Sequence, residues 1–230
     1  SKINLVFKNK NKLKIISPDI IIGADGPLSM IYKSINAKKR KFQYGVQAVV
    51  KGKFNYKTYQ TFFGRKISPN FFGWVVPETK NRARIGLATM NKPNFYFNNF
   101  LERLDITEKQ IIIKQAGLIP LFDPKIRTHY KNIFLLGDAA SHVKATTGGG
   151  IVPSFNEARN LVKSISKRKI YRPKLTNLRR HLLIRNTINK FSDQDYNKLI
   201  KILSKPSNKK LIENNSRENP KKLLLKLILT

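Results

Sequence analysis

The residues best suited to chemistry lie together in one stretch of the sequence. An apolar run at residues 133–136 is followed by Gly137 and Asp138, which predicts a carboxylate at the carboxyl end of a buried strand. Open α/β sheets bind ligands outside that edge. An aspartate there can accept hydrogen bonds from ribityl or ribose hydroxyls, whereas it would repel a bare phosphate. Asp138 is therefore a candidate contact for the polyol part of a ligand.

Three consecutive glycines, Gly148, Gly149 and Gly150, follow, and we expect a helix from Ile151 to about Ser164. Backbone without side chains lets a ligand approach closely, and the N–H groups at a helix N-terminus favour negative charge. Either motif alone is more typical of a plain turn or strand end. Together, in this order and after an apolar strand, they favour a site for one large, flat, phosphorylated cofactor.

Three segments resemble motifs of a known family. The segment GDAASHVKATTGGGI, residues 137–151, closely resembles the second FAD-contact motif of the geranylgeranyl reductase family, a branch of the aromatic-hydroxylase-like flavoproteins. IIGADGPLS, residues 21–29, resembles that family's Asp-Gly motif. PNFFGWVVP, residues 69–77, is similar to its P-x-x-Y-x-W-x-F-P signature, and RIGLA follows at residues 84–88. The motifs occur in family order, and the resemblance covers roughly residues 19–163.

The resemblance implies FAD as the cofactor. It puts Asp138 on the ribityl and pyrophosphate side, Gly150 and Ile151 at the isoalloxazine, and Asp25 with Gly26 near the pyrophosphate. The remaining candidate cofactor-binding residues are Gly137, Gly148 and Gly149.

The resemblance also implies a substrate wall made by Trp74, Phe72 and Pro77. Trp74 is the only tryptophan of the chain, and its residue type alone favours a core aromatic in a sheet. An aromatic wall suits an isoprenoid chain, because such a substrate offers few polar groups to hold. Where the family has Tyr and Phe, this chain has Phe72 and Val76. The hydroxyl of that tyrosine is thus missing, and no catalytic residue is assigned.

The function that the resemblance implies is an FAD-dependent reductase. It would saturate geranylgeranyl double bonds of a membrane lipid precursor, as in archaeal lipid synthesis, or of a prenyl diphosphate. One alternative is an FAD-dependent hydroxylase or halogenase-like monooxygenase. Another is a non-catalytic basic protein that binds nucleic acid or a membrane. Nucleic acid is disfavoured, because Phe71, Phe72 and Trp74 are not interleaved with basic residues as stacking platforms usually are.

No G-x-G-x-x-G strand–turn–helix precedes Asp19. We therefore expect the chain to begin inside the FAD domain. It would be the C-terminal part of a split enzyme, whose partner subunit supplies the N-terminal flavin-binding half, or a truncated copy.

The charge of the chain predicts a polyanionic neighbour. The 230 residues include 46 Lys and Arg against 13 Asp and Glu, a net charge of +33. An anionic membrane surface fits basic amphipathic helices beyond Ser166, and the expected location is cytoplasmic and peripheral at the membrane. Solvated helix faces, or a bias in genome composition, would explain the lysines equally well.

Cysteine and histidine content limits the possible chemistry. The absence of cysteine excludes disulfides, a thiolate nucleophile and Cys-ligated metal. His129, His142 and His181 show no metal-ligand spacing, so no metal site is expected and each is interpreted as a surface or capping residue.

Apolar periodicity predicts the elements that position these motifs. A hairpin is expected from residues 3–7 and 13–16, a buried strand at 19–26 and a short helix from Pro27 to Tyr32. Four sheet strands are expected at residues 42–50, 56–63, 72–76 and 83–88. A helix should follow at 95–104, residues 107–113 are ambiguous between helix and strand, and residues 117–121 should be extended. Beyond Ser166, amphipathic helices are expected, with one apolar face formed by Leu175, Leu178, Leu182 and Leu183, then by Leu199, Ile200 and Leu203, then by Leu223 to Leu229.

These elements predict an α+β or α/β fold. The C-terminal part of an FAD-binding Rossmann-like domain would carry an inserted antiparallel β-sheet substrate domain and a helical C-terminal region. The expected boundaries are a partial FAD-binding domain at 1–35, the sheet domain at 36–117, the FAD-binding domain with the GD and TGGGI motifs at 118–165, and the basic helical region at 166–230.

Overall fold

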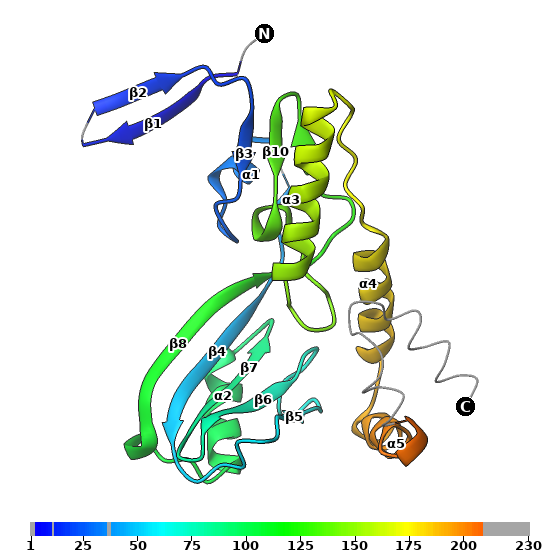
Figure 1. Ribbon diagram of the computed structural model, residues 1–230. Helices are drawn as coiled ribbons and strands as arrows, with labels where there is room; N and C mark the ends of the chain where they lie inside the picture. The colour runs from blue at the N-terminus through cyan, green and yellow to red at the C-terminus, as the bar shows by residue number, and fades with distance from the viewer. Residues whose placement is uncertain (1–2, 11, 36–37, 209–230) are drawn as a thin grey trace. The chain divides into compact units, whose positions relative to one another are not determined.

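The computed structural model describes residues 3–10, 12–35 and 38–208. They divide into two compact units, and Figure 1 labels most of their helices and strands. The first unit comprises the chain up to residue 40 with residues 122–143 and 149–174, and the second comprises residues 41–121, 144–148 and those from 175 onward. A sheet-rich unit is thus inserted into the sequence of the other, which confirms the expected α/β class with an inserted antiparallel sheet.

The first unit is built around a small sheet with the strand order β3-β10-β9. Strand β3 (Ile21–Gly23) is parallel to β10 (Ile133–Leu135), and β9 (His129–Tyr130) is antiparallel to β10. Parallel neighbours require a long crossover connection. Here that connection contains the whole sheet of the second unit.

Helices cover the two faces of this sheet. Helix α1 (Met30–Ile35) packs on the face that carries Ile21, Ile133 and Leu135. The opposite face carries Phe134, whose ring lies 5.6 Å from the ring of Tyr171. Tyr171 in turn donates a hydrogen bond to Glu157 of helix α3 (Ile151–Ser166). Helix α3 turns a stripe of three residues inward, Pro153, Glu157 and Leu161.

The N-terminal hairpin forms as predicted. Strands β1 (Leu5–Asn9) and β2 (Lys12–Ile16) pair antiparallel, and Lys10 in the turn has a positive φ of 42°. Every residue of β2 is exposed, including Leu13 at 74% and Ile15 at 65%. The hairpin therefore presents apolar side chains beside lysines.

The second unit contains a five-stranded antiparallel sheet with the order β5-β6-β7-β4-β8. All four predicted strands are present, with a fifth at the edge. The strands are β4 (Phe42–Lys51), β5 (Gln60–Phe62), β6 (Gly73–Thr79), β7 (Arg82–Thr89) and β8 (Ile111–Pro120).

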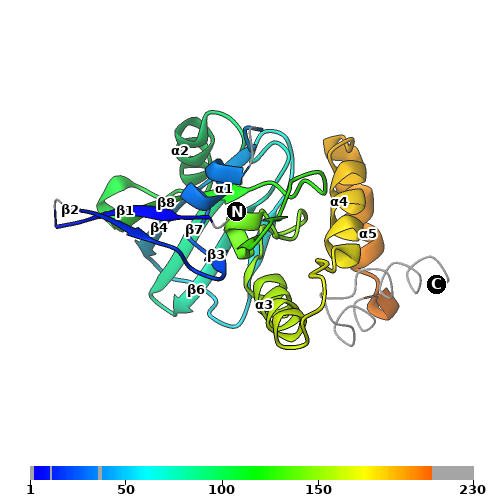
Figure 2. The ribbon, with the colours of Figure 1, turned by 90° about the horizontal axis from the view of Figure 1, so that it is seen from above.

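Helix α2 (Pro93–Arg103) covers one face of this sheet, as Figure 2 shows. Its apolar stripe of Phe97, Phe100 and Leu101 forms the core with the inward side chains of β4 and β7. In the part of the chain up to residue 208, two further helices of this unit follow, α4 (Thr176–Ile188) and α5 (Asp193–Leu203). Within the described ranges, no helix combines the length and apolarity needed to cross a lipid bilayer.

Two elements differ from their predicted bounds near the Asp-Gly motif. Helix α1 begins at Met30, not at Pro27, because the Asp25 carboxylate accepts hydrogen bonds from the backbone N–H groups of Met30 (2.7 Å) and Ile31 (3.4 Å). The predicted buried strand is reduced to Ile21–Gly23, and its middle residue Ile22 is 48% exposed.

The ambiguous segment resolves into two elements. Residues 108–110 form a short 3₁₀ turn, η1 (Glu108–Gln110), and β8 begins at Ile111. A capping box between Thr107 and Gln110 closes this turn, which explains the mixed pattern in the sequence.

The buried face of α4 was predicted only in part. It consists of Leu178, His181 and Arg185, whereas Leu183 is 67% exposed. Leu178 is buried as expected, but the prediction missed His181 and Arg185 because it counted leucines only. His142 and His181 are likewise buried, at 1% and 4% exposure, and are not surface residues. The predicted helix at Leu223 to Leu229 lies outside the described residues.

Candidate functional site

The two acidic motifs of the first unit lie at the same sheet edge. Gly23 of β3 pairs with Leu135 of β10, so the loop containing Asp25 and the turn η2 (Gly137–Ala140) both leave the carboxyl ends of neighbouring parallel strands. Ligands of open α/β sheets bind at this edge. The fold thus brings together two motifs that are more than a hundred residues apart in the sequence.

Arg40 joins the two loops. Its Nη2 donates to the carbonyl oxygen of Pro27 (2.5 Å), and its Nη1 donates to those of Asp138 (2.8 Å) and Ala139 (2.9 Å). Its guanidinium also lies 3.9 Å from the ring centroid of Tyr32. Sequence reasoning missed Arg40, because it is one of several adjacent basic residues and nothing in that run marks it as buried.

Asp138 is half-buried, and burial raises the pKa of its carboxyl group while the nearby Arg40 charge lowers it in part. Among the residues that the structure describes, none donates a hydrogen bond to this carboxylate. A half-buried carboxylate without donors is costly unless a ligand supplies them. The hydroxyl groups of a polyol are donors of this kind.

Gly150 lies against the Asp138 carboxylate. A Cβ atom at residue 150 would stand 2.9 Å from Asp138 Oδ1 and 3.1 Å from Val143 Cγ1, so a larger residue would force the carboxylate to move. Helix α3 begins directly after it at Ile151, and among the described residues no side chain caps that N-terminus. The Ser154 hydroxyl donates to the Gly150 carbonyl oxygen at 2.6 Å and holds this first turn.

Two other glycines of the first unit lie in turns with a positive φ. Gly137 has a φ of +58°, and a Cβ there would meet Ser154 Oγ at 2.9 Å. Gly26 has a φ of +78° with open space beside it. Asp25 itself is engaged by the start of α1. Burial raises its pKa, but hydrogen bonds from Ser29 and from the backbone at Met30 and Ile31 outweigh burial and lower it.

Gly148 belongs to the second unit, whereas Gly149 and Gly150 belong to the first. It has a φ of +68°, and a Cβ there would stand 3.2 Å from Ile119 Cγ2 and 3.5 Å from Phe71 Cζ. The turn that ends in Gly148 therefore packs directly on the aromatic signature segment.

The aromatic residues of that segment form a continuous cluster. Phe71 is buried and stacks on Phe72 with 4.4 Å between ring centroids, and Phe72 makes an edge contact of 6.0 Å with Trp74. Trp74 lies over Gly86 of the neighbouring strand, where a Cβ would come within 2.6 Å of its indole. Side chains alternate along a strand. Pro77 therefore lies on the sheet face opposite Trp74.

A second buried polar cluster lies beneath α3. The Glu157 carboxylate accepts hydrogen bonds from the Tyr171 hydroxyl (2.5 Å) and the Lys174 backbone N–H (3.1 Å). His142 Nδ1 is 3.9 Å from Glu157 Oε2, too far for a hydrogen bond. Burial lowers the pKa of His142 from 6.5 to about 4. At neutral pH this contact therefore joins a neutral ring to a carboxyl group and is not an ion pair.

We expect His142 to make the folded chain less stable in acid. Above pH 6.5 the ring is neutral in both the folded and the unfolded chain. Between pH 6.5 and about 4 only the unfolded chain binds the proton. The free energy of unfolding should therefore fall by about 1.4 kcal/mol per pH unit, or about 3 kcal/mol in all.

Urea unfolding at pH 7, 5 and 4 measures this difference. The variant His142→Gln should lose less stability over this range than the wild type, and His129→Gln, at an exposed histidine, should behave as the wild type. Equal losses for His142→Gln and the wild type would contradict the assignment.

Two known reductases resemble this chain in sequence. No protein-family profile matches the chain. The chain is 30% identical over 245 residues to digeranylgeranylglycerophospholipid reductase 3 of Methanosphaera stadtmanae. The alignment covers 90% of this chain and 60% of that protein. It is 29% identical over 163 residues to digeranylgeranylglycerophospholipid reductase 2 of Methanothermobacter thermautotrophicus, covering 64% of this chain and 40% of that protein.

Solved structures agree on the fold. A geranylgeranyl bacteriochlorophyll reductase-like protein from Thermoplasma acidophilum superposes with a TM-score of 0.67 at 19% identity, over 87% of this chain and 60% of that one. The flavin-dependent halogenase CmlS superposes with a TM-score of 0.54 at 15% identity, over 87% of this chain and 38% of that one. At these identities the likeness concerns the fold alone.

The chain thus spans 60% and 40% of the length of the two reductases that it matches in sequence. Similarity in sequence and in fold confirms its resemblance to the geranylgeranyl reductase family over the part of those proteins that it spans.

Proposed function

We propose that this chain binds FAD and forms part of a reductase that saturates isoprenoid double bonds. The observation that carries the proposal is the half-buried Asp138 carboxylate, which lacks a donor among the described residues and lies against the bare backbone of Gly150. The names of its sequence relatives, digeranylgeranylglycerophospholipid reductases, suggest a geranylgeranyl lipid precursor as the substrate class. A prenyl diphosphate is a second substrate of the same chemistry.

The residues present fit such a cofactor. Asp138 would accept hydrogen bonds from the ribityl hydroxyls, and Gly150 and Ile151 would present backbone N–H groups to the electron-rich edge of the ring system. Reduced FAD, when bound, supplies a hydride for addition to an alkene carbon, and a proton completes the saturation. Phe72 and Trp74 would hold the apolar chain and keep water away from it.

The part of the FAD site not spanned by this chain is proposed to come from an N-terminal flavin-binding half, either as a partner subunit or as additional sequence. The first unit offers a surface for it. Helix α3 exposes an apolar stripe of Ile151 (75%), Phe155 (65%) and Val162 (60%), and Ile22 is exposed on edge strand β3. An edge strand leaves a row of unpaired backbone N–H and C=O groups, so β3 can pair with an additional strand while the exposed stripe of α3 packs against its neighbours.

The proposal is tested by producing the chain together with a candidate flavin-binding half and measuring bound FAD. The chemically reduced complex is then given a geranylgeranyl lipid without oxygen. Mass spectrometry should show a gain of two hydrogens per saturated double bond. A complex that holds FAD but leaves the double bonds intact would overturn the reductase assignment.

A hydroxylase or halogenase is the second candidate, because CmlS shares the fold. That chemistry requires oxygen and adds an oxygen or halogen atom to the substrate. Repeating the assay in air separates the two: an oxygenated or halogenated product formed only in air would favour the second candidate.

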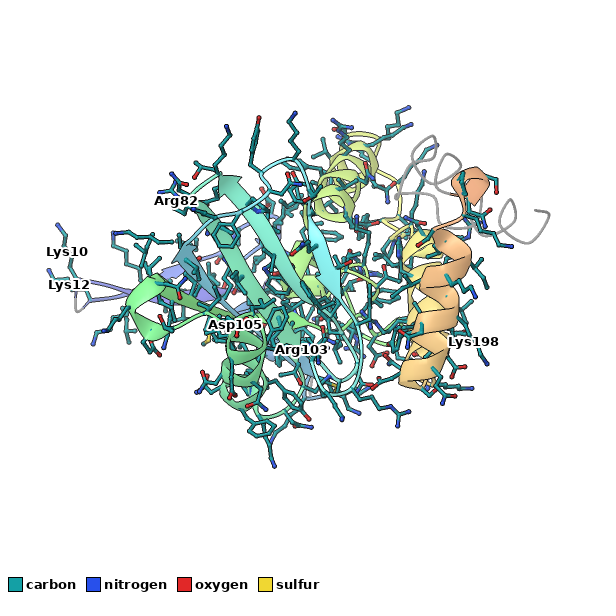
Figure 3. The ribbon with its side chains drawn as sticks, turned by 90° about the horizontal axis from the view of Figure 1, so that it is seen from below. Lys10, Lys12, Arg82, Arg103, Asp105 and Lys198 are labelled. Atoms are coloured by element: carbon teal, nitrogen blue, oxygen red, sulfur yellow. The ribbon has the colours of Figure 1, made fainter. Side chains whose placement is uncertain are left out.

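We also propose that the protein works in the cytoplasm, peripherally at an anionic membrane. Lysines at the hairpin tip, Lys10 and Lys12, and Lys198 on α5 extend away from the ribbon in Figure 3. The hairpin adds exposed Leu13 and Ile15 to these charges. Apolar side chains beside lysines suit the interface of an anionic bilayer.

Binding to anionic vesicles should therefore weaken steeply as salt rises from 0.05 to about 0.5 M, because salt screens exposed charges. Neutral vesicles of equal size are the control, and co-sedimentation measures the bound fraction. Equal binding to both kinds of vesicle would contradict the proposal.

A further inference from the structure

Helix α4 holds the turn that leads into the three glycines. Arg185 donates two hydrogen bonds to consecutive carbonyl oxygens of this turn, from Nε to Ala145 (2.9 Å) and from Nη2 to Thr146 (2.8 Å). One helical turn earlier, His181 Nδ1 is hydrogen-bonded to Thr146 Oγ1 at 2.7 Å. Two neighbouring residues of the turn are thus held from a single helix face.

The turn itself is tightly wound. The backbone N–H groups of Thr147 (3.2 Å) and Gly148 (2.8 Å) both donate to the carbonyl oxygen of Lys144, and Gly148 has a positive φ. These two N–H groups point into the turn. The carbonyl oxygens of Ala145 and Thr146 therefore remain available to side chains of α4. Arg185 can reach two of them at once because its guanidinium is a planar fork of donors.

Arg185 and His181 together form a clamp on residues 145 and 146, and both side chains are buried. Arg185 is 7% exposed and His181 is 4% exposed. The guanidinium lies 4.9 Å from the ring centroid of Phe71, whose Cζ atom is 3.5 Å from the position that a Cβ of residue 148 would take. Burial lowers the pKa of Arg185, but an arginine keeps its charge in proteins. A charged donor in a dry setting makes stronger hydrogen bonds than a neutral one.

We propose that Arg185, assisted by His181, is a positioning residue that sets the backbone conformation at Gly148. Gly148 is covalently joined to Gly149 and Gly150, so the clamp determines how the chain enters the glycine segment. Helix α4 would then serve ligand binding and not only the surface charge of the protein. The link to a flavin rests on the proposed function, whereas the clamp itself does not.

Hydrogen exchange of the full chain tests the clamp without any cofactor. Arg185→Gln should raise exchange in a peptide covering residues 144–150 by about tenfold or more, since charge-assisted hydrogen bonds of this strength are lost. Arg185→Lys keeps the charge but not the fork and should show an intermediate rate. Thr146→Val removes only the His181 bond and should have a smaller effect in the same peptide.

Arg179→Gln is the matched control. It removes the same charge from the exposed side of the same helix and should leave exchange at residues 144–150 unchanged. Thermal unfolding of each variant shows whether the unit is folded. Should Arg185→Gln fail to fold, Arg185→Lys and Thr146→Val decide the outcome. Unchanged exchange in the folded Arg185 variants would overturn the clamp.

A second measurement connects the clamp to the flavin. In the complex loaded with FAD, Arg185→Lys should shift the visible flavin spectrum and lower FAD affinity by about tenfold, whereas Arg179→Gln should change neither. If the wild-type complex takes up no FAD, the proposed function fails and the exchange result still stands for the clamp. If Arg185→Lys alters hydrogen exchange at residues 144–150 but leaves the flavin spectrum and the FAD affinity unchanged, the proposed role of Arg185 in positioning the glycine segment is overturned.

Discussion

Replacing Arg40 by methionine should lower the free energy of unfolding of the first unit by about 3 kcal/mol, equivalent to one or two charge-assisted hydrogen bonds. Arg40 donates to the carbonyl oxygens of Pro27, Asp138 and Ala139. Methionine preserves much of the volume beside Tyr32 but leaves these oxygens without the donor. The Arg40 side chain is only partly buried, so water can replace some of the lost hydrogen bonds. The loss of stability is therefore smaller than that expected for three charge-assisted hydrogen bonds.

Chemical denaturation measures this loss, and Lys39→Met is the matched control. Lys39 is exposed and precedes Arg40 directly in the chain, so its replacement should change stability by less than about 0.5 kcal/mol. Arg40→Lys should lie between the two, because a single ammonium cannot reach all three oxygens. Equal stability of Arg40→Met and Lys39→Met would refute the role of Arg40 as the link between the two loops.

Gly150→Ala and Asp138→Ala should each lower FAD affinity by about tenfold or more, or at least 1.4 kcal/mol. A Cβ at residue 150 would stand 2.9 Å from Asp138 Oδ1, so the carboxylate must move from the position where it would meet the ribityl hydroxyls. Asp138→Ala removes the acceptor itself. Quenching of flavin fluorescence on titration into the assembled complex measures both.

Gly117→Ala provides the control for an added methyl group. Gly117 lies in strand β8, and a Cβ there would meet no atom of the described residues within 4 Å. This variant should bind FAD as the wild type does. Full affinity in both the Gly150 and the Asp138 variants would remove the basis for placing the ribityl chain at this edge of the sheet.

Local patterns in the sequence were sufficient to predict most helices and strands. The alternation around residues 8–12 predicted the β1–β2 hairpin, and the apolar strand followed by glycine and aspartate predicted β10 and its turn. The glycines before Ile151 predicted the start of α3. These features depend on neighbours in the chain, and short-range backbone preferences and side-chain periodicity express them directly.

Polar residues at inward positions were not predictable in this way. The leucines of α4 suggested an apolar face, but His181 and Arg185 occupy it because their hydrogen bonds to residues 145 and 146 compensate their burial. A buried polar group is recognised only when its partner is known. That partner lies some 35 to 40 residues away in the sequence.

By itself, the sequence determined the motifs of the site: an aspartate after a strand, three glycines before a helix, and an aromatic signature in a sheet. Only the tertiary structure decided that Asp25 is engaged by its own helix, that Asp138 has no donor among the described residues, and that Arg40 joins their loops. The reason is physical. Hydrogen-bond satisfaction depends on which groups the fold brings within about 3 Å of each other, and the chain order does not contain that information.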